Sequence, residues 1–580
     1  MTSFSFGVLG IEYGGHDTSA SIVCDGQIIA ACEQERFDLE KHSRNFPIDA
    51  IRECLNISGI NDINQLHEIA FAGDYFDMIR KTYIEPALKD NKRIHFLLND
   101  AERLKGFLNQ EEIIRKNTSY NGPIKFYRHH LCHLASTYFP SGFDDALLVS
   151  FDGMGEIETA MIGSAKNGSI EIVNDENHYP HSLGLFYSAI TFFLGWKHHC
   201  DEGIIMGLAP LGDPNAILAN TGKSYIEVFR EIIFPVDKLR FEIDLSWIEY
   251  HNKRDTWVSN KFIKVFGKKR DYSDPITNHH KNIAAALQLR LEELVLPQLR
   301  YLRKKTGHSK LCVSGGVGLN CSLNGKILAA NIFDEVFVQP ASGDAGVSLG
   351  AALLASKLNL GRKMAISKNH NSYLGSRFTD KQIEEALNQY ELPYTKPEKF
   401  YDVIASELEK GKIVGWFQGA AEFGPRALGS RSILSKPFPE EQRDHINRRV
   451  KFREEFRPFA PAVLKERAND YFDISQDSPH MLIACKVKKE MKEKIPATVH
   501  VDDSCRVQTV TEDLNSRFYK LLTCFEQKTG CPVLLNTSFN VKGQPIVNNP
   551  IQAIDTFLKT NIDILVIGSF VLSKEENSNA

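Results

Sequence analysis

The sequence lacks the features of a membrane, secreted or nucleic-acid-binding protein. No apolar run approaches the ~20 residues that a membrane-spanning helix needs. Residues 1–15 lack the basic start and long apolar run of a signal peptide. The 69 basic and 73 acidic residues leave a net charge of -4, so no basic field favours nucleic acid. We therefore expect a cytoplasmic protein with neither a membrane nor a nucleic-acid partner.

The cysteines are scattered along the chain without pairing. The 11 cysteines are an odd number, and no two have the Cys-x-x-Cys spacing. This usage argues against a disulfide framework or a structural zinc site and favours reduced thiols. At 580 residues the chain exceeds what one core accommodates, so we expect two to four domains. The composition is that of a large α/β enzyme.

Short apolar runs alternate with helical patterns, which predicts an α/β fold. Asp25-Gly26 between two β-rich runs predicts a hairpin. The clearest helical pattern runs from Asn278 to Lys305 and stops near Gly307. No internal repeat is visible. Strands are predicted at 7–11, 20–24, 28–31, 146–151, 311–313, 336–338, 412–417, 533–535 and 562–566, and further helices at 345–358 and 381–388.

A polar segment without periodicity separates two regions of α/β pattern. It contains Gly361 and lies around residue 365. We therefore predict a first domain over residues 1–360, a linker over 361–375 and a second domain over 376–580.

The first chemical cluster contains two histidines four residues apart. On a helix, His129 and His133 would share one face. Together with a carboxylate from elsewhere, such a pair suits Fe(II) or another transition metal. Asp152 and Asp344 both lie beside glycine, near the end of an apolar strand, and are candidates for that carboxylate. Packing or capping histidines remain an alternative.

A glycine-rich segment, Ser314-Gly315-Gly316-Val317-Gly318-Leu319-Asn320, follows the predicted strand 311–313. Its backbone amides could approach phosphate oxygens without a Cβ in the way. The spacing matches neither a Walker loop nor a dinucleotide fingerprint. A tight packing turn is an equally good interpretation. Gly343 and Gly346 could contact the other side of the same nucleotide.

The second domain carries a group of cationic residues interleaved with glycine, proline and aromatic residues. These positions favour a pocket over a hydrated surface, and guanidinium and ammonium groups bind phosphate well. Surface salt bridges or RNA contacts are the alternatives. The motifs are Phe423-Gly424-Pro425-Arg426-Ala427-Leu428-Gly429-Ser430-Arg431-Ser432, Lys451-Phe452-Arg453, Phe456-Arg457-Pro458-Phe459, Arg506 and Asn536-Thr537-Ser538-Phe539-Asn540.

These motifs resemble those of the NodU/CmcH family of O-carbamoyltransferases over essentially the whole chain. In the first half the resemblance is carried by Gly14-Gly15-His16-Asp17-Thr18-Ser19-Ala20, Glu35-Arg36-Phe37, Lys41-His42, the His129–His133 cluster and the 314–320 segment. It implies an actin-like ATPase domain built from two ribonuclease-H-like subdomains, similar to threonylcarbamoyl transferases. It also implies His129, Asp152 and Asp344 as metal ligands, with His133 a ligand or immediate neighbour.

In the second half, FGPRALGSRSI, KFREEFRPFAP and LLNTSFN resemble the family's C-terminal, YrdC-like domain. The resemblance implies ATP and carbamoyl phosphate as ligands, with Mg(II) accompanying the ATP. The implied binding residues are Arg426, Arg431, Lys451, Arg457, Arg506, Ser538 and Asn540. The glycine-rich residues Gly315, Gly316, Gly318, Asn320 and Gly343 would contact nucleotide in the first domain. Ile204 departs from the family, which often has lysine there.

The resemblance implies ATP-dependent carbamoyl transfer in two steps. Lys451 and Arg457, with the other cations, would stabilise formation of carbamoyl adenylate in the second domain. At the metal, for which Fe(II) is preferred over Mn, Co or Zn, a small-molecule hydroxyl would then be carbamoylated, with His16 or His133 as the base. A fused threonylcarbamoyl-transfer enzyme acting on tRNA and a nucleotide-dependent regulatory module are the alternatives. The acceptor is not predicted, and a homodimer is left open.

Overall fold

The computed structural model describes residues 4–361 and 371–574. Contacts divide the chain into two compact units. The first comprises residues 1–28, 46–48 and 59–369, and the second comprises 29–45, 49–58 and 370–580. The inclusion of 29–45 and 49–58 in the second unit was not anticipated from sequence. Most of the predicted linker, residues 362–370, lies outside the described part of the chain.

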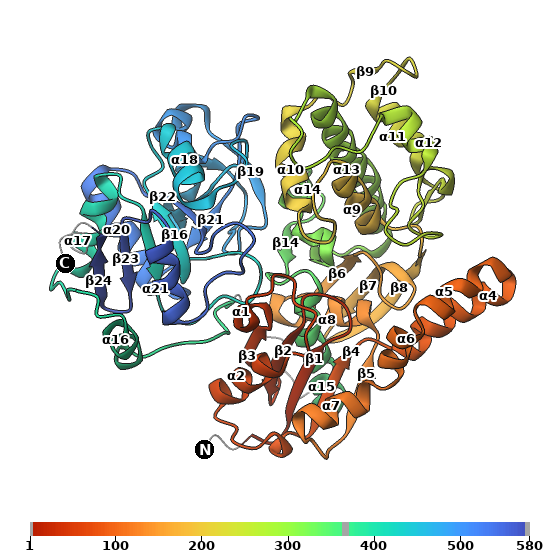
Figure 1. Ribbon diagram of the computed structural model, residues 1–580, viewed down its shortest axis with the longest axis horizontal. Helices are drawn as coiled ribbons and strands as arrows, with labels where there is room; N and C mark the ends of the chain where they lie inside the picture. Colours follow the sequence, from red (N-terminus) through yellow and green to blue (C-terminus); the bar gives the residue numbers. More distant parts are fainter. Residues whose placement is uncertain (1–3, 362–370, 575–580) are drawn as a thin grey trace. The chain divides into compact units, whose positions relative to one another are not determined.

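Two five-stranded sheets with the same strand pattern organise the N-terminal part of the fold (Figure 1). The first has the order β3-β2-β1-β4-β5, and the second, read in the same sense, is β8-β7-β6-β13-β14. In the first sheet, β1 pairs antiparallel with β2 and parallel with β4. In the second sheet, β6 pairs in the same way with β7 and β13. This duplication is the ribonuclease-H-like arrangement expected of an actin-like ATPase domain. The strands are β1 (Gly7–Glu12), β2 (Ser19–Cys24), β3 (Gln27–Glu33), β4 (Glu68–Ala72), β5 (Ile124–Tyr127), β6 (Asp145–Phe151), β7 (Glu158–Lys166), β8 (Ser169–His178), β13 (Lys310–Ser314) and β14 (Glu335–Val338).

Two buried helices, α8 (His129–Ser141) and α15 (Val347–Leu360), connect these sheets. Helix α8 packs on β6 and β13, α15 packs on β1 and β4, and the two helices pack on each other. Small residues make the close approach possible. A Cβ on Gly350 would lie 1.8 Å from the carbonyl oxygen of Cys132, and one on Gly10 would lie 1.9 Å from that of Ser348. The two helices therefore fix the relative position of the two sheets.

The remaining helices of the first unit form two groups. Helix α13, capped at its C-terminus by left-handed Gly307, packs with α9, α10, α11 and α14 beyond the second sheet (Figure 1). No helix among the described residues has the length and apolarity to cross a membrane. The second-sheet group is α9 (Leu183–Phe193), α10 (Glu202–Leu208), α11 (Tyr225–Ile232), α12 (Asn260–Phe266), α13 (Asn278–Thr306) and α14 (Cys321–Ala329), with the short strands β9 (Ile217–Leu218), β10 (Lys223–Ser224), β11 (Ile233–Pro235) and β12 (Phe241–Ile243). The other group is α3 (Tyr75–Met78), α4 (Glu85–Lys89), α5 (Ile94–Asn99), α6 (Ala101–Leu108) and α7 (Gln110–Thr118).

The second unit is built on a seven-stranded mixed sheet of order β21-β17-β22-β16-β15-β23-β24. Its interior strand β15 alternates between two cores: Val414 and Trp416 face one apolar cluster, whereas Phe417 faces the other. A small sheet, β18-β19-β20, adjoins the first core. The strands are β15 (Val414–Phe417), β16 (Arg431–Ser435), β17 (Ala460–Leu464), β18 (Phe472–Asp473), β19 (Ala484–Val487), β20 (Ser504–Arg506), β21 (Gln508–Val510), β22 (Val533–Ser538), β23 (Ile564–Ile567) and β24 (Phe570–Ser573). The helices are α1 (Glu35–Asp38), α2 (Ile48–Ser58), α16 (Asp380–Gln389), α17 (Phe400–Glu409), α18 (Glu441–Ile446), α19 (Ala468–Tyr471), α20 (Ser516–Thr529) and α21 (Pro550–Lys559).

The predicted α/β fold class is confirmed, and each predicted strand and helix overlaps one in the structure. The helix predicted from Asn278 to Lys305 spans Asn278–Thr306. The absence of a visible sequence repeat was misleading, because the duplication lies in strand order and pairing. Ile204 lies buried in α10, where its apolar side chain is 5% exposed.

Candidate metal centre and phosphate-binding site

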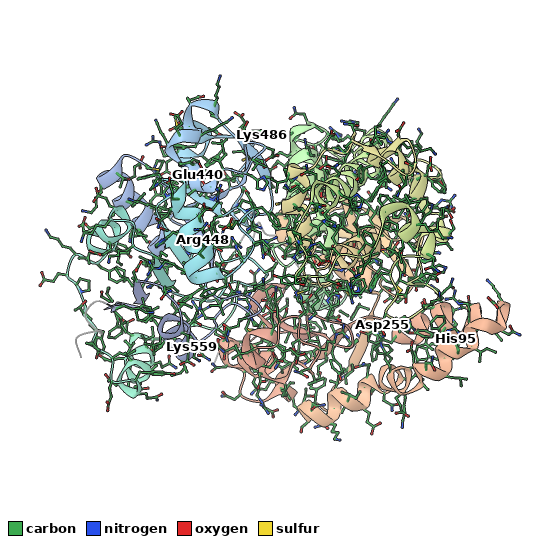
Figure 2. All side chains as sticks on the ribbon, turned by 45° about the horizontal axis from the view of Figure 1, so that its top comes forward. His95, Asp255, Glu440, Arg448, Lys486 and Lys559 are labelled. Atoms are coloured by element: carbon green, nitrogen blue, oxygen red, sulfur yellow. The ribbon has the colours of Figure 1, made fainter. Side chains whose placement is uncertain are left out.

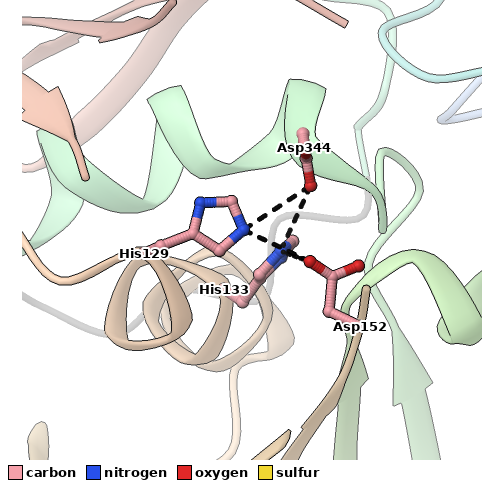
Figure 3. A group of neighbouring side chains, drawn as sticks. All are labelled: His129, His133, Asp152 and Asp344. Atoms are coloured by element: carbon pink, nitrogen blue, oxygen red, sulfur yellow. Dashed lines mark hydrogen bonds and ion pairs between the residues drawn. The ribbon is translucent and has the colours of Figure 1, made fainter. Parts of the chain in front are cut away.

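Four side chains predicted as metal ligands meet in the first unit (Figure 3). The Nε2 atom of His129 lies 3.3 Å from Asp152 Oδ2 and 3.5 Å from Asp344 Oδ1. The Nε2 atom of His133 lies 3.5 and 3.7 Å from the same two oxygens. One ligand atom from each of the four residues lies within 4.8 Å of all the others. The structure thus brings together residues that are more than 200 positions apart in sequence.

The fold explains this convergence. His129 and His133 are one helical turn apart at the start of α8, Asp152 directly follows β6, and Asp344 begins the short turn before α15. Gly155 lets the loop after β6 approach α8, because a Cβ there would lie 2.9 Å from the ring of His130 and 3.2 Å from Cβ of His129. The four ligands are therefore held by the same helices and strand ends that join the two sheets.

The donor set and its spacing fit a transition metal. Two ligand atoms about 2.1 Å from one ion, at right angles or tetrahedral angles, are roughly 3.0–3.4 Å apart. The four nitrogen–oxygen separations of 3.3–3.7 Å need only a small contraction to reach this geometry. Asp152 uses its other oxygen, Oδ1, to accept a 2.7 Å hydrogen bond from the Gly316 amide, which orients the carboxylate.

The histidines and carboxylates of this cluster shift one another's pKa values in the direction opposite to burial. Burial alone would lower the pKa of His129, but the carboxylates of Asp152 and Asp344 outweigh burial and raise the pKa well above its usual value. Burial would raise the pKa of Asp152, but the two histidines lower it well below the ordinary range. His130 faces away: its nitrogens lie 2.9 Å from Ser150 Oγ and 2.9 Å from the Glu158 carbonyl, and burial lowers its pKa to about 3. His130 is thus a structural residue.

His16, the other predicted base, lies beside the cluster. Its Nδ1 is 2.9 Å from Asp17 Oδ2, and its Nε2 is 3.9 Å from Asp344 Oδ2. The side chain is 28% exposed, so a substrate can reach it. The ring lies 5.5 Å from that of His199, measured between centroids.

Two buried glutamates near the cluster were missed by sequence analysis. Glu156 is 3% exposed, and its Oε1 accepts hydrogen bonds from the amides of His129 at 2.8 Å and Asp74 at 2.9 Å. Glu12 ends β1, and burial raises its pKa well above the ordinary value. The only sequence signal was an acidic residue within an apolar or glycine-rich run. Glu156 therefore holds the start of the helix that carries the two histidines, and the raised pKa of Glu12 favours its uncharged form beside the candidate metal ligands.

The glycine-rich loop is shaped first by packing. Gly315 has a φ of +84°, and a Cβ there would lie 2.2 Å from the Phe151 carbonyl oxygen. A Cβ on Gly318 would lie 2.2 Å from Ser342 Oγ. Asn320 caps α14 through a 2.9 Å bond from the Leu323 amide. Gly343 is different, because a Cβ there would meet no atom closer than 3.9 Å. Packing thus requires glycine at positions 315 and 318, and a contact of the loop with nucleotide phosphate stays a prediction.

In the second unit, Lys451 is the centre of a compact polar site. Its side chain is buried, and Nζ donates to the Ser538 carbonyl at 2.5 Å, the Asn540 carbonyl at 3.0 Å and Asn540 Oδ1 at 2.7 Å. Burial, reinforced by Arg453 and Arg457, lowers the pKa of Lys451 well below its usual value. The structure thus brings together Lys451, Ser538 and Asn540, three of the residues that the resemblance implies as ligand-binding.

Three arginines extend this cationic site. Burial, followed by Arg457 and Arg506, lowers the pKa of Arg453 well below its ordinary value. The Arg453 guanidinium stacks over the Phe459 ring at 4.3 Å and donates to Asn447 Oδ1 at 2.8 Å. Arg453 was present in the motif but was not predicted as a site residue. Such mutual repulsion among cations is relieved when an anion binds.

Arg426 and Arg431 occupy different environments. The loop between them folds around Glu422, whose Oε1 accepts bonds from the amides of Leu428 and Ser430 at 2.7 and 2.8 Å. Arg431 is completely buried and donates to the carbonyls of Gln418 and Ser376 at 2.8 and 2.9 Å. Its guanidinium is therefore committed to backbone oxygens in this structure. Arg426 is only partly buried on the same loop.

A family model described as carbamoyltransferase N-terminus matches residues 7–353, and one described as carbamoyltransferase C-terminus matches residues 405–574. The chain therefore belongs to the carbamoyltransferase family and is a transferase. It is 36% identical to the nodulation protein NolNO of Sinorhizobium fredii, over 97% of this chain and 80% of that protein. It is 37% identical to NolO of Bradyrhizobium diazoefficiens, over 78% of this chain and 79% of that protein. An uncharacterized protein of Synechocystis sp. is 36% identical over 98% of this chain and 96% of its own length.

Proposed function

We propose that this carbamoyltransferase uses ATP to convert carbamoyl phosphate into carbamoyl adenylate in its second unit. Its first unit then transfers the carbamoyl group to a hydroxyl of a small molecule. The observation that carries the proposal is the Lys451 site, where a buried ammonium, Ser538 and Asn540 converge beside several arginines. Glu454 supplies a negative charge in this cluster, 3.6 Å from Arg457, against the positive charges of Lys451, Arg453 and Arg457. A buried cluster with such an excess of positive charge favours phosphate ligands.

In the activation step, water releases inorganic phosphate from carbamoyl phosphate, and a carbamate oxygen bonds to the α-phosphorus of ATP. The bond from that phosphorus to pyrophosphate breaks. Lys451 and Arg457 would stabilise the negative charge that develops on the transferring phosphate, with Mg(II) accompanying the ATP. Arg426 and Arg506 would hold the phosphates, and we assign Arg431 a positioning role because its donors bind loop carbonyls.

In the transfer step, His16 is the better placed of the two predicted bases. Asp17 binds Nδ1 of the ring and favours the tautomer in which Nε2 accepts a proton. The acceptor hydroxyl would lose its proton to Nε2 while its oxygen attacks the carbamoyl carbon, and AMP would leave. His129, His133, Asp152 and Asp344 would hold a divalent transition metal, with Fe(II) suited to the donor set, and such a metal supplies Lewis-acid activation when bound.

The decisive experiment measures ATP–pyrophosphate exchange that depends on carbamoyl phosphate. We expect Lys451→Ala to lose exchange by about 100-fold or more, because a charged contact made in the transition state is removed. That variant should still transfer the carbamoyl group from supplied carbamoyl adenylate. Lys559→Ala, at a side chain 74% exposed (Figure 2), is the matched control. Exchange at the normal rate in Lys451→Ala would refute the two-step scheme.

A further inference from the structure

Two cysteines of the second unit face each other across neighbouring strands. Cys485 in β19 is directly opposite Cys505 in β20, and the two sulfur atoms are 4.0 Å apart. Both side chains point toward the same apolar core, Cys505 within it and Cys485 at its edge. All 11 cysteines are thiols in this structure. The two strands therefore hold the pair in register, with the sulfur atoms beyond bonding distance.

The backbone is compatible with a bond between the two sulfurs. The amide of Val487 donates to the Asp503 carbonyl at 2.9 Å, two residues along in the same antiparallel register. By the alternation of antiparallel pairs, Cys485 and Cys505 form a hydrogen-bonded pair with Cα atoms about 5.5 Å apart. Disulfides span Cα separations of about 4.4–6.8 Å. Side-chain rotation, with a small movement of the strands, can bring the sulfurs to the bonded distance of about 2.05 Å.

Exposure distinguishes this pair from the other interacting thiols. Cys485 is partly exposed, and its neighbour Lys486 is exposed at the surface (Figure 2). Cys32 and Cys54 also share a hydrogen bond, but they are 4% and 0% exposed. An oxidant in solution can therefore reach Cys485, whereas the Cys32–Cys54 pair is shielded.

We propose that Cys485 and Cys505 form a reversible disulfide that acts as a peroxide-sensitive modification site. The Cys485 thiolate attacks hydrogen peroxide, the O–O bond breaks, and a sulfenic acid and hydroxide form. The Cys505 sulfur then attacks the sulfenic sulfur, the S–O bond breaks, and water leaves as the S–S bond forms. Both electrons come from the two thiols and pass to peroxide. A dithiol reductant reverses the modification by exchange.

The position of the pair links it to the cationic site. Arg506 directly follows Cys505 on β20 and is one of the charges that lower the pKa of Arg453. The small movement of β19 and β20 that accompanies closure of the sulfurs is passed directly to Arg506, because it is bonded to Cys505 on the same strand. This regulatory consequence rests on the proposed function: oxidation displaces Arg506 from the phosphates and slows adenylate formation.

The test maps cysteines in the full-length protein before and after treatment with hydrogen peroxide. After alkylation and proteolysis, we expect the peptides carrying Cys485 and Cys505 to be joined, with the loss of two hydrogen atoms. Dithiothreitol should restore both alkylated peptides. Cys485→Ser should abolish the joined peptide, whereas Cys524→Ser, at another partly exposed cysteine of this unit, should retain it. If both cysteines stay alkylatable, or Cys485 is oxidised without joining Cys505, the modification site is refuted.

Exchange assays on the same samples test the regulatory half. We expect the oxidised protein to lose about tenfold or more of its carbamoyl-phosphate-dependent exchange, the effect of losing one charge-assisted contact. Dithiothreitol should restore it, and peroxide-treated Cys485→Ser should retain it. Full exchange in the joined form would refute the regulation. Absent exchange in the reduced wild type would instead refute the proposed function, and the peptide map would still decide the modification.

Discussion

Replacing Glu156 tests how the candidate metal ligands are positioned. Helix α8 starts at His129, and its cap residue Arg128 makes no side-chain capping bond. The first amide groups of a helix need partners. Glu156 supplies one from outside the helix by accepting from the His129 amide at 2.8 Å, and the same oxygen binds the Asp74 amide at 2.9 Å. Glu156 thus fixes the helix that carries both histidines to the loop that carries Asp152.

The expected magnitude follows from these two bonds. Glu156→Ala removes both and leaves a helix-terminal amide buried, which costs about 2 kcal/mol by comparison with lost caps and charged acceptors. Loss of an outer residue that orients a metal ligand lowers affinity by about 10–100-fold. Glu156→Gln retains an oxygen acceptor and loses only the charge near the helix N-terminus, worth about 0.3–1 kcal/mol. We therefore expect a large loss of metal affinity for Ala and a small one for Gln.

The assay is titration of the metal-free protein with Co(II), followed by its visible absorption bands. Glu171→Ala, at an exposed side chain of β8, serves as the control. Circular dichroism and thermal unfolding establish that each variant is folded at the titration temperature. Unchanged Co(II) affinity in folded Glu156→Ala would refute the positioning argument. Equal losses in Ala and Gln would show that charge, and not the hydrogen bonds, is responsible.

Three further predictions concern packing, acid stability and the glycine-rich loop. Gly350→Ala places a Cβ 1.8 Å from the Cys132 carbonyl oxygen, so denaturant melts should show a loss of about 3 kcal/mol or more in the free energy of unfolding. The control Gly203→Ala, whose Cβ would have no atom within 4 Å, should not lower the free energy of unfolding. Burial lowers the pKa of His181, whose Nδ1 accepts a hydrogen bond from the Ile243 amide at 3.0 Å. Below about pH 6.5 the unfolded state therefore binds more protons than the folded state. On acidification, the stability of the wild type should fall faster than that of His181→Asn, by at most ~1.4 kcal/mol per pH unit. Gly343→Ala should leave the melting temperature unchanged while weakening ATP binding to the first unit. Gly318→Ala should instead lower the melting temperature. A stable Gly343→Ala variant with normal ATP binding would exclude nucleotide from the loop at Gly343.

Local sequence patterns predicted the helices and strands well. Which site residues lie together in space was predicted only from the resemblance to a family. The four-residue spacing of His129 and His133 is a property of one helix, and α8 has it. The approach of Asp152 and Asp344 depends on how two sheets pack through α8 and α15, which no local pattern encodes. Glu156 and Glu422, which accept backbone amides beside the candidate site residues, carried no signal beyond an acidic residue in an apolar or glycine-rich run. A buried acid that accepts backbone amides has no characteristic neighbours in sequence.

Residue type also failed to separate binding from packing, and the structure shows why. Arg431 and Arg426 occur in one glycine-rich motif, yet Arg431 is wholly buried on carbonyl oxygens and stacks over Phe417 at 3.7 Å. Gly315 and Gly318 are required by a carbonyl and a hydroxyl 2.2 Å from the position of a Cβ, before any phosphate is considered. Loss of function at such positions would therefore report a damaged fold. Positions whose substitution leaves packing intact, such as Gly343 and the partly exposed Arg426, are where an effect on nucleotide binding identifies a ligand contact.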